Sequence, residues 1–280
     1  MSEENKKGCD SSTCSKTDCK NCAHKKKNLK IAPNEKNKIK KIVAVVSGKG
    51  GVGKSSVTSM MAVALNKKGY KVGILDADIT GPSIPQIFGV HTIAEGNKKD
   101  GIMPVETKNG IKLMSINLLL ESEDTPVVWR GPVIAGVVKQ FWTDVIWGEL
   151  DYLLIDMPPG TGDVPLTVFQ SFPVDGILMI TTPQSLVGMI VKKACKMAEK
   201  LNIPILGLIE NYSYMRCKNC NEKMDVFGKS KLEEFANENQ LEILGKLPID
   251  PEFAVLEDEG KVEEYENPEL EMAVEKVCKL

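Results

Sequence analysis

Long apolar runs are missing from this sequence of 280 residues, and so is a strong excess of charge of either sign. No segment approaches the roughly 20 apolar residues that a membrane-spanning helix requires. The N-terminus is polar and rich in cysteine, and it lacks the apolar core of a signal peptide. The formal net charge is −2 and the isoelectric point is about 5.9, which gives no general support for nucleic-acid binding. We therefore expect a soluble, cytoplasmic protein that binds neither membranes nor nucleic acid.

The end of the chain is acidic. From Pro251 onward it carries ten Asp or Glu residues against three Lys residues. An amphipathic helix that targets a membrane surface would need the opposite sign of charge on its polar face. The sequence therefore gives no support for a membrane-targeting C-terminal helix.

The segment GKGGVGKS, from Gly48 to Ser55, has the pattern of a phosphate-binding loop. An apolar β-branched run precedes it, and a helical pattern from Lys54 to Lys68 follows it. The glycines allow successive N–H groups to face phosphate oxygens, and the helix N-terminus adds partial positive charge. Lys54 would reach the β- and γ-phosphates of ATP, and the Ser55 hydroxyl would ligate Mg²⁺. The predicted nucleotide-binding residues here are Gly48, Lys49, Gly50, Gly51, Val52, Gly53, Lys54, Ser55 and Ser56.

Aspartates follow two other predicted strands. Asp76 and Asp78 end one apolar run, and Asp156 ends another that continues into a Pro- and Gly-containing loop over 157–163. An apolar strand ending in aspartate is typical of the carboxylate that orients a magnesium-bound water, and the following loop suits a nucleotide-sensitive switch. A single aspartate at such a place is often only a helix cap or turn former. Three of them after strands, in a chain with a phosphate-binding loop, indicate one site.

Strand and helix patterns alternate along most of the chain, which predicts an α/β fold with a doubly wound, mostly parallel sheet. Strands are expected near 42–46, 72–76, 112–116, 152–156, 176–181, 204–209 and 242–246, and helices over 54–68, 132–146, 184–201 and 229–239. Residues 1–41 hold few large apolar side chains and end in a lysine-rich run, so we expect a separate disordered tail before a domain over 42–280. The polar stretch 90–110 is expected at the surface.

Cys217 and Cys220 form a C-x-x-C pair after a predicted strand end. In a cytosolic enzyme such a pair is more often a metal or redox site than a disulfide. A tetrahedral zinc or an iron–sulfur cluster requires about four ligands, and a dimer would supply the other two by symmetry. Thiol redox chemistry and structural thiols or zinc remain the alternatives.

A second set of cysteines, Cys9, Cys14, Cys19 and Cys22, lies within the N-terminal tail. Four thiolates in so short a segment can close around one cluster, and zinc would be satisfied by the same ligands. Cys195 and Cys278 lack ligand spacing, and Cys195 is expected in the core.

The GKGGVGKS loop resembles that of the deviant-Walker-A ATPases, the class of MinD, ParA and nitrogenase reductase. In that class the additional lysine, here Lys49, crosses a dimer interface and contacts the neighbour's nucleotide, as an arginine finger does elsewhere. The resemblance implies a homodimer, and it places Asp76 and Asp78 near magnesium and the attacking water, with their roles undivided. The simpler alternative for Lys49 is a solvated loop lysine.

Further segments resemble the Mrp/ApbC family of P-loop ATPases, in the family's order: GPSIPQIFGV, WRGP, LLIDMPPGTGD and IENYSYMRCKNC. That family comprises dimeric iron–sulfur cluster scaffolds and carriers. The resemblance implies a 4Fe–4S cluster bridging two subunits at Cys217 and Cys220, and an adenine-recognising role for Asn211. Only some members carry an N-terminal cluster motif, and its usual spacing differs from the C-x4-C-x4-C-x2-C found here.

The resulting hypothesis is an ATP-hydrolysing carrier that receives a cluster from a donor and transfers it to apo-proteins. The main alternative is a ParA/MinD-like positioning ATPase with a structural zinc site, although the expected basic DNA-binding face or basic tail is not evident in the sequence. A nitrogenase-reductase-like electron donor would carry its two cysteines far apart rather than as C-x-x-C. A zinc-stabilised signalling ATPase is separated from the carrier by metal analysis.

Overall fold

The computed structural model describes residues 30–280 except 98–100, 123–124, 126 and 185–186. The tail cysteines Cys9, Cys14, Cys19 and Cys22 therefore lie outside the described residues. Among the residues that are described, no helix is both long enough and apolar enough to cross a membrane.

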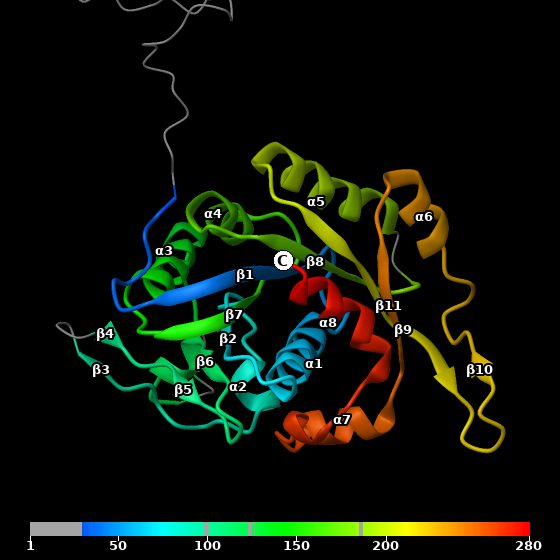
Figure 1. Cartoon of the computed structure of the whole chain (residues 1–280), viewed down its shortest axis with the longest axis horizontal. Helices are drawn as coiled ribbons and strands as arrows, with labels where there is room; N and C mark the ends of the chain where they lie inside the picture. The colour runs from blue at the N-terminus through cyan, green and yellow to red at the C-terminus, as the bar shows by residue number, and fades with distance from the viewer. Residues whose placement is uncertain (1–29, 98–100, 123–124, 126, 185–186) are drawn as a thin grey trace, which may run out of the picture.

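A nine-stranded sheet forms the centre of the described structure, in the order β10-β9-β8-β1-β7-β2-β6-β5, with β11 pairing with β9 (Figure 1). All its ladders are parallel except those of β10 with β9 and β5 with β6. A separate hairpin pairs β3 with β4. The strands are β1 Lys38–Ser47, β2 Val72–Asp76, β3 Gly96–Asn97, β4 Gly101–Ile102, β5 Val105–Glu106, β6 Lys112–Met114, β7 Glu149–Asp156, β8 Gly176–Thr181, β9 Ile205–Arg216, β10 Lys223–Met224 and β11 Ile243–Pro248.

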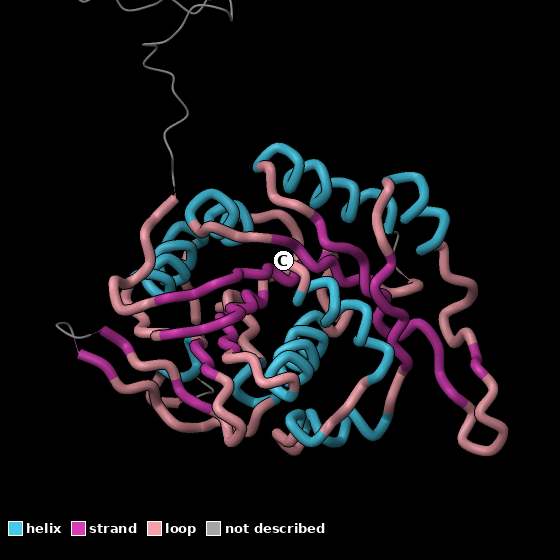
Figure 2. Tube along the Cα trace, viewed as in Figure 1, coloured by secondary structure: helices cyan, strands magenta, loops and turns pink. Residues whose placement is uncertain are grey.

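Helices cover both faces of the sheet, as Figures 1 and 2 show. One layer contains α3, α4, α5 and α6, and the other contains α1, α2, α7 and α8. The helices are α1 Lys54–Lys67, α2 Ile84–Ile87, α3 Gly131–Thr143, α4 Asp163–Ser171, α5 Val187–Leu201, α6 Leu232–Asn239, α7 Pro251–Asp258 and α8 Glu271–Cys278. The predicted doubly wound, mostly parallel sheet is confirmed.

The central strands are buried along their length because helices lie on both sides of them. Every residue of β2 and β8 is buried, and β1 is buried from Ile42 to Ser47. This burial explains why these strands are continuous apolar runs rather than alternating ones. Cys195 is buried in α5, in agreement with the core position expected for a cysteine without ligand spacing.

The structured part begins earlier than the expected residue 42. β1 starts at Lys38, and its lysines pair with acidic side chains of β7, as in the 2.7 Å contact between Lys40 Nζ and Asp151 Oδ1. Upstream, the Ile31 N–H donates to the carbonyl of Ser171 at 2.8 Å. The lysine-rich composition therefore suggested a disordered tail where the chain in fact packs against the domain near Ile31 and begins β1 at Lys38. In the described part of residues 90–110, the regular elements are the short strands β3, β4 and β5.

Candidate functional site

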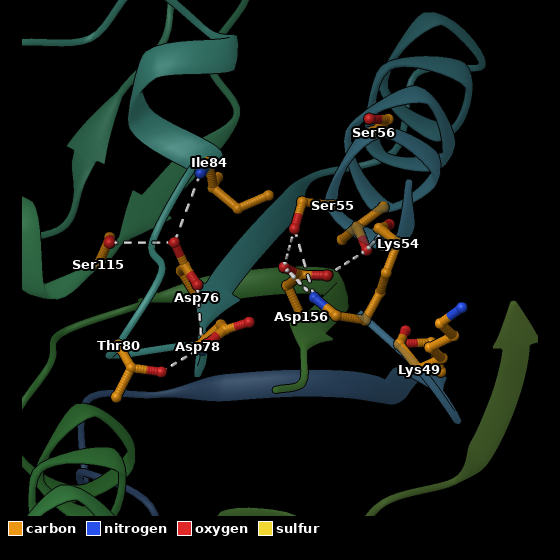
Figure 3. A network of polar contacts seen from close by, with 12 residues as sticks. Lys49, Lys54, Ser55, Ser56, Asp76, Asp78, Thr80, Ile84, Ser115 and Asp156 are labelled. Carbon is orange, nitrogen blue, oxygen red and sulfur yellow. Dashed lines mark hydrogen bonds and ion pairs between the residues drawn. The ribbon is translucent and has the colours of Figure 1, made fainter. Parts of the chain in front are cut away.

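The residues predicted to bind nucleotide converge at the carboxyl ends of the central parallel strands (Figure 3). The phosphate-binding loop joins β1 to α1, while Asp76 ends β2 and Asp156 ends β7. These two aspartates lie directly opposite each other in the ladder between β2 and β7. The fold thus brings together three segments that are far apart in the sequence, at the sheet edge where α/β proteins bind ligands.

Asp156 is the centre of a buried polar network. One of its oxygens, Oδ2, lies 2.7 Å from Lys54 Nζ and accepts a hydrogen bond from Ser55 Oγ at 2.6 Å. The other oxygen accepts from Thr58 Oγ1 at 2.7 Å. The side chains of Lys54 and Asp156 are only 6% and 0% exposed. The ammonium of Lys54 therefore compensates the negative charge of a carboxylate that water does not reach. Thr58 was not among the residues predicted from the sequence, although its place one helical turn after Lys54 was a usable signal.

Asp76 and Asp78 differ in their surroundings. Asp76 is 1% exposed and accepts hydrogen bonds from the Asp78 N–H and from Ser115 Oγ, both at 3.1 Å. Burial, reinforced by the negative charge of Asp156, raises the pKa of Asp76 to about 8. Burial also raises the pKa of Asp78, which is less deeply buried and lines the open cavity. Asp78 is therefore the better placed of the two to face a ligand directly.

A cavity of about 440 Å³ opens beside the loop. It is lined by most of the loop, by Asp78, and by Gln86, Tyr212 and Glu257, which the sequence analysis missed. Glu257 lies on α7 and accepts a hydrogen bond from Ser56 Oγ at 2.6 Å. Nothing in the local sequence marks Glu257, because only tertiary packing brings α7 to the loop.

Asn211 packs directly behind the phosphate-binding loop. Its side-chain amide donates to the Val52 carbonyl at 3.0 Å, and the residue is 3% exposed. This contact supports the loop from β9. The predicted role of Asn211 in adenine recognition stays a prediction.

Gly53 should not tolerate a side chain. Its φ is +72°, and a Cβ atom there would lie 2.2 Å from Asn211 Nδ2. We expect Gly53→Ala to weaken nucleotide binding at least about tenfold, because the left-handed strain of about 1–3 kcal/mol is joined by a steric clash behind the loop. Calorimetric titration with Mg-ATP measures this effect. Gly51→Ala is the matched control, since Gly51 has a φ of +74° but a Cβ atom there would meet no atom within 4 Å. Equal effects of the two substitutions would contradict the clash.

Lys49 differs from Lys54 in exposure and direction. It is exposed at the mouth of the cavity, and Figure 3 shows its ammonium pointing away from Asp156. Within the described part of the chain this ammonium makes no hydrogen bond or ion pair. The geometry leaves Lys49 available to a group outside its own subunit.

Cys217 and Cys220 lie in the turn of a hairpin formed by β9 and β10. The Cys217 N–H donates to the Glu222 carbonyl at 3.0 Å, and the Asn221 N–H donates to the Cys217 carbonyl at 2.8 Å. Both thiols are free, Cys217 being half-buried and Cys220 exposed. The backbone N–H groups of Cys220 and Asn219 lower the pKa of the Cys217 thiol, which favours the thiolate that binds metal. Among the described residues, no three or more His, Cys, Asp or Glu side chains are grouped so that they could hold a metal ion by themselves.

The hairpin is held to the rest of the domain by polar contacts. Glu269 accepts hydrogen bonds from Tyr214 Oη at 2.6 Å and from Arg216 Nη2 at 3.1 Å. The buried Glu210 accepts from Ser213 Oγ at 2.6 Å and from Ser230 Oγ, and so joins the strand to the returning chain. These contacts hold the end of β9 that leads into the C-x-x-C turn, and the same strand carries Asn211.

Comparison with known proteins agrees with this arrangement. The family model described as "NUBPL iron-transfer P-loop NTPase" matches residues 38–280. An iron-sulfur cluster carrier protein of Clostridium perfringens is 50% identical over 248 residues, which cover 85% of this chain and 87% of that protein. The cytosolic Fe-S cluster assembly factor CFD1 of Candida glabrata is 46% identical, with 80% of this chain and 82% of that protein covered.

Solved structures show the same fold. A nucleotide-binding protein of Archaeoglobus fulgidus, solved in complex with ADP, is 46% identical with a TM-score of 0.75, and the match covers 83% of this chain and 91% of that one. The septum site-determining protein MinD of Pyrococcus horikoshii, complexed with Mg-ADP, is 20% identical with a TM-score of 0.57 over 86% and 95% of the two chains, and it shows the fold alone. By the match over residues 38–280 and the identities of its relatives, this chain belongs to the NUBPL iron-transfer P-loop NTPase family.

Proposed function

We propose that this protein is an ATP-dependent iron–sulfur cluster carrier. ATP binds at the loop over residues 48–55, and a labile 4Fe–4S cluster is held as cargo between Cys217 and Cys220 of two subunits. ATP hydrolysis accompanies cluster loading or transfer to apo-proteins. The names of the relatives from Clostridium perfringens and Candida glabrata support the carrier role and, for the latter, a cytosolic location.

The observation that carries this proposal is the course of β9. Asn211 in this strand contacts the phosphate-binding loop, and Cys217 follows the last residue of the same strand. Six residues of strand span at most about 20 Å. A single element therefore joins the nucleotide cavity to the C-x-x-C turn, as a carrier that couples ATP to its cargo requires.

The chemistry of the C-x-x-C turn supports a cluster shared by two subunits. One turn supplies two thiolates, whereas a 4Fe–4S cluster requires about four ligands. Beside the turn, Met224, Val226 and Phe227 are exposed apolar side chains that a second subunit can cover. The exposed ammonium of Lys49 supports the same homodimer, because it is available to a nucleotide bound by the partner.

The residues around Asp156 fit a magnesium ion. Hydroxyl and carboxylate oxygens are the ligands that Mg²⁺ prefers, and Ser55 Oγ, Asp156 and the nearby Asp78 provide them. Bound Mg²⁺ would neutralise charge on the β- and γ-phosphates. Lys54 would orient these phosphates, Asp156 would position the ion through water, and Asp76 and Asp78 would hold or position the attacking water.

A positioning ATPase with a structural zinc site is the alternative. Its support is the fold shared with MinD, and at 20% identity that likeness reaches no further than the fold. The carrier is supported in addition by relatives at 46–50% identity.

Cluster transfer tests the proposal directly. Protein reconstituted anaerobically with iron and sulfide is expected to convert an apo-ferredoxin into its cluster-bound form, and Mg-ATP is expected to change the rate. Absorption and circular dichroism spectra of the acceptor follow the transfer. A reconstituted protein that retains its cluster in the presence of apo-acceptor, with and without Mg-ATP, would contradict the carrier role.

Deleting residues 1–29 is expected to remove one cluster per chain and nothing else. Four thiolates of one tail suffice for one site, while the first described contacts of the docked segment begin at Lys30 and Ile31 and are kept. Iron, zinc and ATP binding of the truncated protein are measured against the full chain. Loss of zinc with iron unchanged would show that the tail holds zinc, and loss of metal from the C-x-x-C site as well would show that the two sites are not independent.

A further inference from the structure

The nucleotide cavity has an acidic side that phosphate binding does not explain. Glu257 and Asp258, at the C-terminal end of α7, both line the cavity together with the glycine-rich loop. Carboxylates repel phosphates unless a cation lies between them, and neither side chain is among the residues proposed to hold Mg²⁺, so the triphosphate gives them no role. They also lie at a helix C-terminus, where the helix dipole disfavours negative charge. When a residue carries an unfavourable charge at the border of a binding cavity, that charge indicates that the residue takes part in ligand binding.

The contact between Glu257 and Ser56 fixes the position of the acidic group relative to the phosphates. Lys54 and Ser55 mark the β- and γ-phosphate end, where they meet Asp156. Ser56 is the next residue of α1, and Figure 3 shows it well away from Asp156 and Lys54. Its hydroxyl donates to Glu257 Oε1 at 2.6 Å. Glu257 is therefore placed beyond the phosphate end of the cavity, on the side where the sugar of a bound nucleotide follows.

Glu257 is held in place before any ligand binds. The end of α7 packs closely on the end of α2, since a Cβ atom on Gly260 would lie 2.4 Å from the Gly89 Cα. Gly89 and Gly260 both have positive φ values, of +62° and +67°, so two turns that favour glycine meet there. Partial burial raises the pKa of the Glu257 carboxyl, while the Ser56 hydrogen bond favours its charged form. A carboxylate offers about four acceptor positions, and Ser56 uses one of them.

We propose that Glu257 accepts a hydrogen bond from a ribose hydroxyl of the bound nucleotide and thereby makes the site selective for ribonucleotides over deoxyribonucleotides. The inference rests on the proposed function, because it needs ATP in this cavity. An acidic side chain that binds ribose hydroxyls is an established solution in dinucleotide-binding folds. Here the carboxylate comes from a helix far from the loop in the sequence, as the separation of 201 residues between Ser56 and Glu257 shows.

The test compares three nucleotides on the full-length protein by calorimetric titration in the presence of Mg²⁺: ATP, 2′-deoxy-ATP and 3′-deoxy-ATP. The wild-type protein is expected to bind ATP about tenfold more tightly than at least one deoxy analogue, which is the size expected for a hydrogen bond to a charged group. Glu257→Ala should abolish this preference. It should weaken ATP binding and leave the affinity for that analogue within about twofold of the wild-type value. Glu257→Gln keeps an uncharged acceptor and the shape of the side chain, so its preference should be intermediate.

Glu252→Ala is the matched control, because Glu252 is an exposed acidic residue in the first turn of the same helix and does not line the cavity. It should keep the full preference for ATP. Equal affinity of the wild-type protein for all three nucleotides, or an undiminished preference in both Glu257 variants, would overturn the inference and leave the proposed function standing. Absence of ATP binding by the wild-type protein would overturn both.

Discussion

Replacing both Cys217 and Cys220 with alanine is expected to abolish the bridging cluster and its transfer to an apo-acceptor. Both cysteines lie in the turn of the hairpin between β9 and β10, and neither forms a disulfide. Because each chain is proposed to supply half of the ligands, the double variant would remove all four thiolates from the proposed dimer. ATP binding should be unchanged, since neither cysteine lines the nucleotide cavity. Iron and sulfide content, the absorption spectrum and a transfer assay measure the effect.

The control for this variant is Cys278→Ser, which changes a free, half-buried cysteine without ligand spacing near the end of α8. It should keep both the cluster and the transfer activity. The experiment is cleanest in protein that lacks residues 1–29, where cluster signal from Cys9, Cys14, Cys19 and Cys22 is absent. Unchanged transfer by the double variant would refute the assignment of the cargo site.

Lys49→Ala should reduce ATP turnover on the order of 10³-fold while changing ATP affinity much less. Lys54 is the residue proposed to hold the phosphates within the subunit, where it contacts Asp156, whereas the ammonium of Lys49 points away from that network (Figure 3). A cation supplied by the partner subunit stabilises charge that develops in the transition state, and arginine fingers contribute rate factors of this order. Steady-state hydrolysis rates and calorimetric titration separate the two effects.

Heterodimers test whether Lys49 acts on the partner's nucleotide. Mixing Lys49→Ala with Asp156→Asn should restore part of the activity, because one of the two sites then combines an intact Asp156 with an intact Lys49 from the other subunit. Lys108→Ala, a change at an exposed lysine outside the cavity, should leave turnover unchanged. Full activity of the single Lys49→Ala variant would disprove the proposed role.

The sequence was sufficient for features that depend on short contiguous patterns. The glycine-rich loop and the buried strands ending in Asp76 and Asp156 were predictable, because a parallel sheet places the carboxyl ends of its strands at one edge. The structure then brings these groups together, as the ladder pairing of Asp76 with Asp156 shows. Their catalytic and metal-binding roles stay predictions, which the geometry supports and the variants above test.

Other features depend on tertiary packing and have no local signal. Glu257 reaches the loop only because α7 packs on α2 through the close approach of Gly89 and Gly260. The beginning of β1 was missed because lysines normally indicate a solvated tail, whereas Lys40 pairs with Asp151 on the neighbouring strand. Short helices such as α7, with eight residues, carry too few turns for a clear helical periodicity.

A cluster shared by two subunits is tested most directly by measuring metal content and mass on the same protein. Protein lacking residues 1–29 is reconstituted anaerobically with iron and sulfide, analysed for iron, sulfide and zinc, and sedimented at equilibrium. We expect one 4Fe–4S cluster for every two chains, carried by a dimer, and we expect both the cluster and the dimer to be lost when Cys217 and Cys220 are replaced. A cluster carried by monomers, or zinc in place of iron at these cysteines, would contradict this expectation.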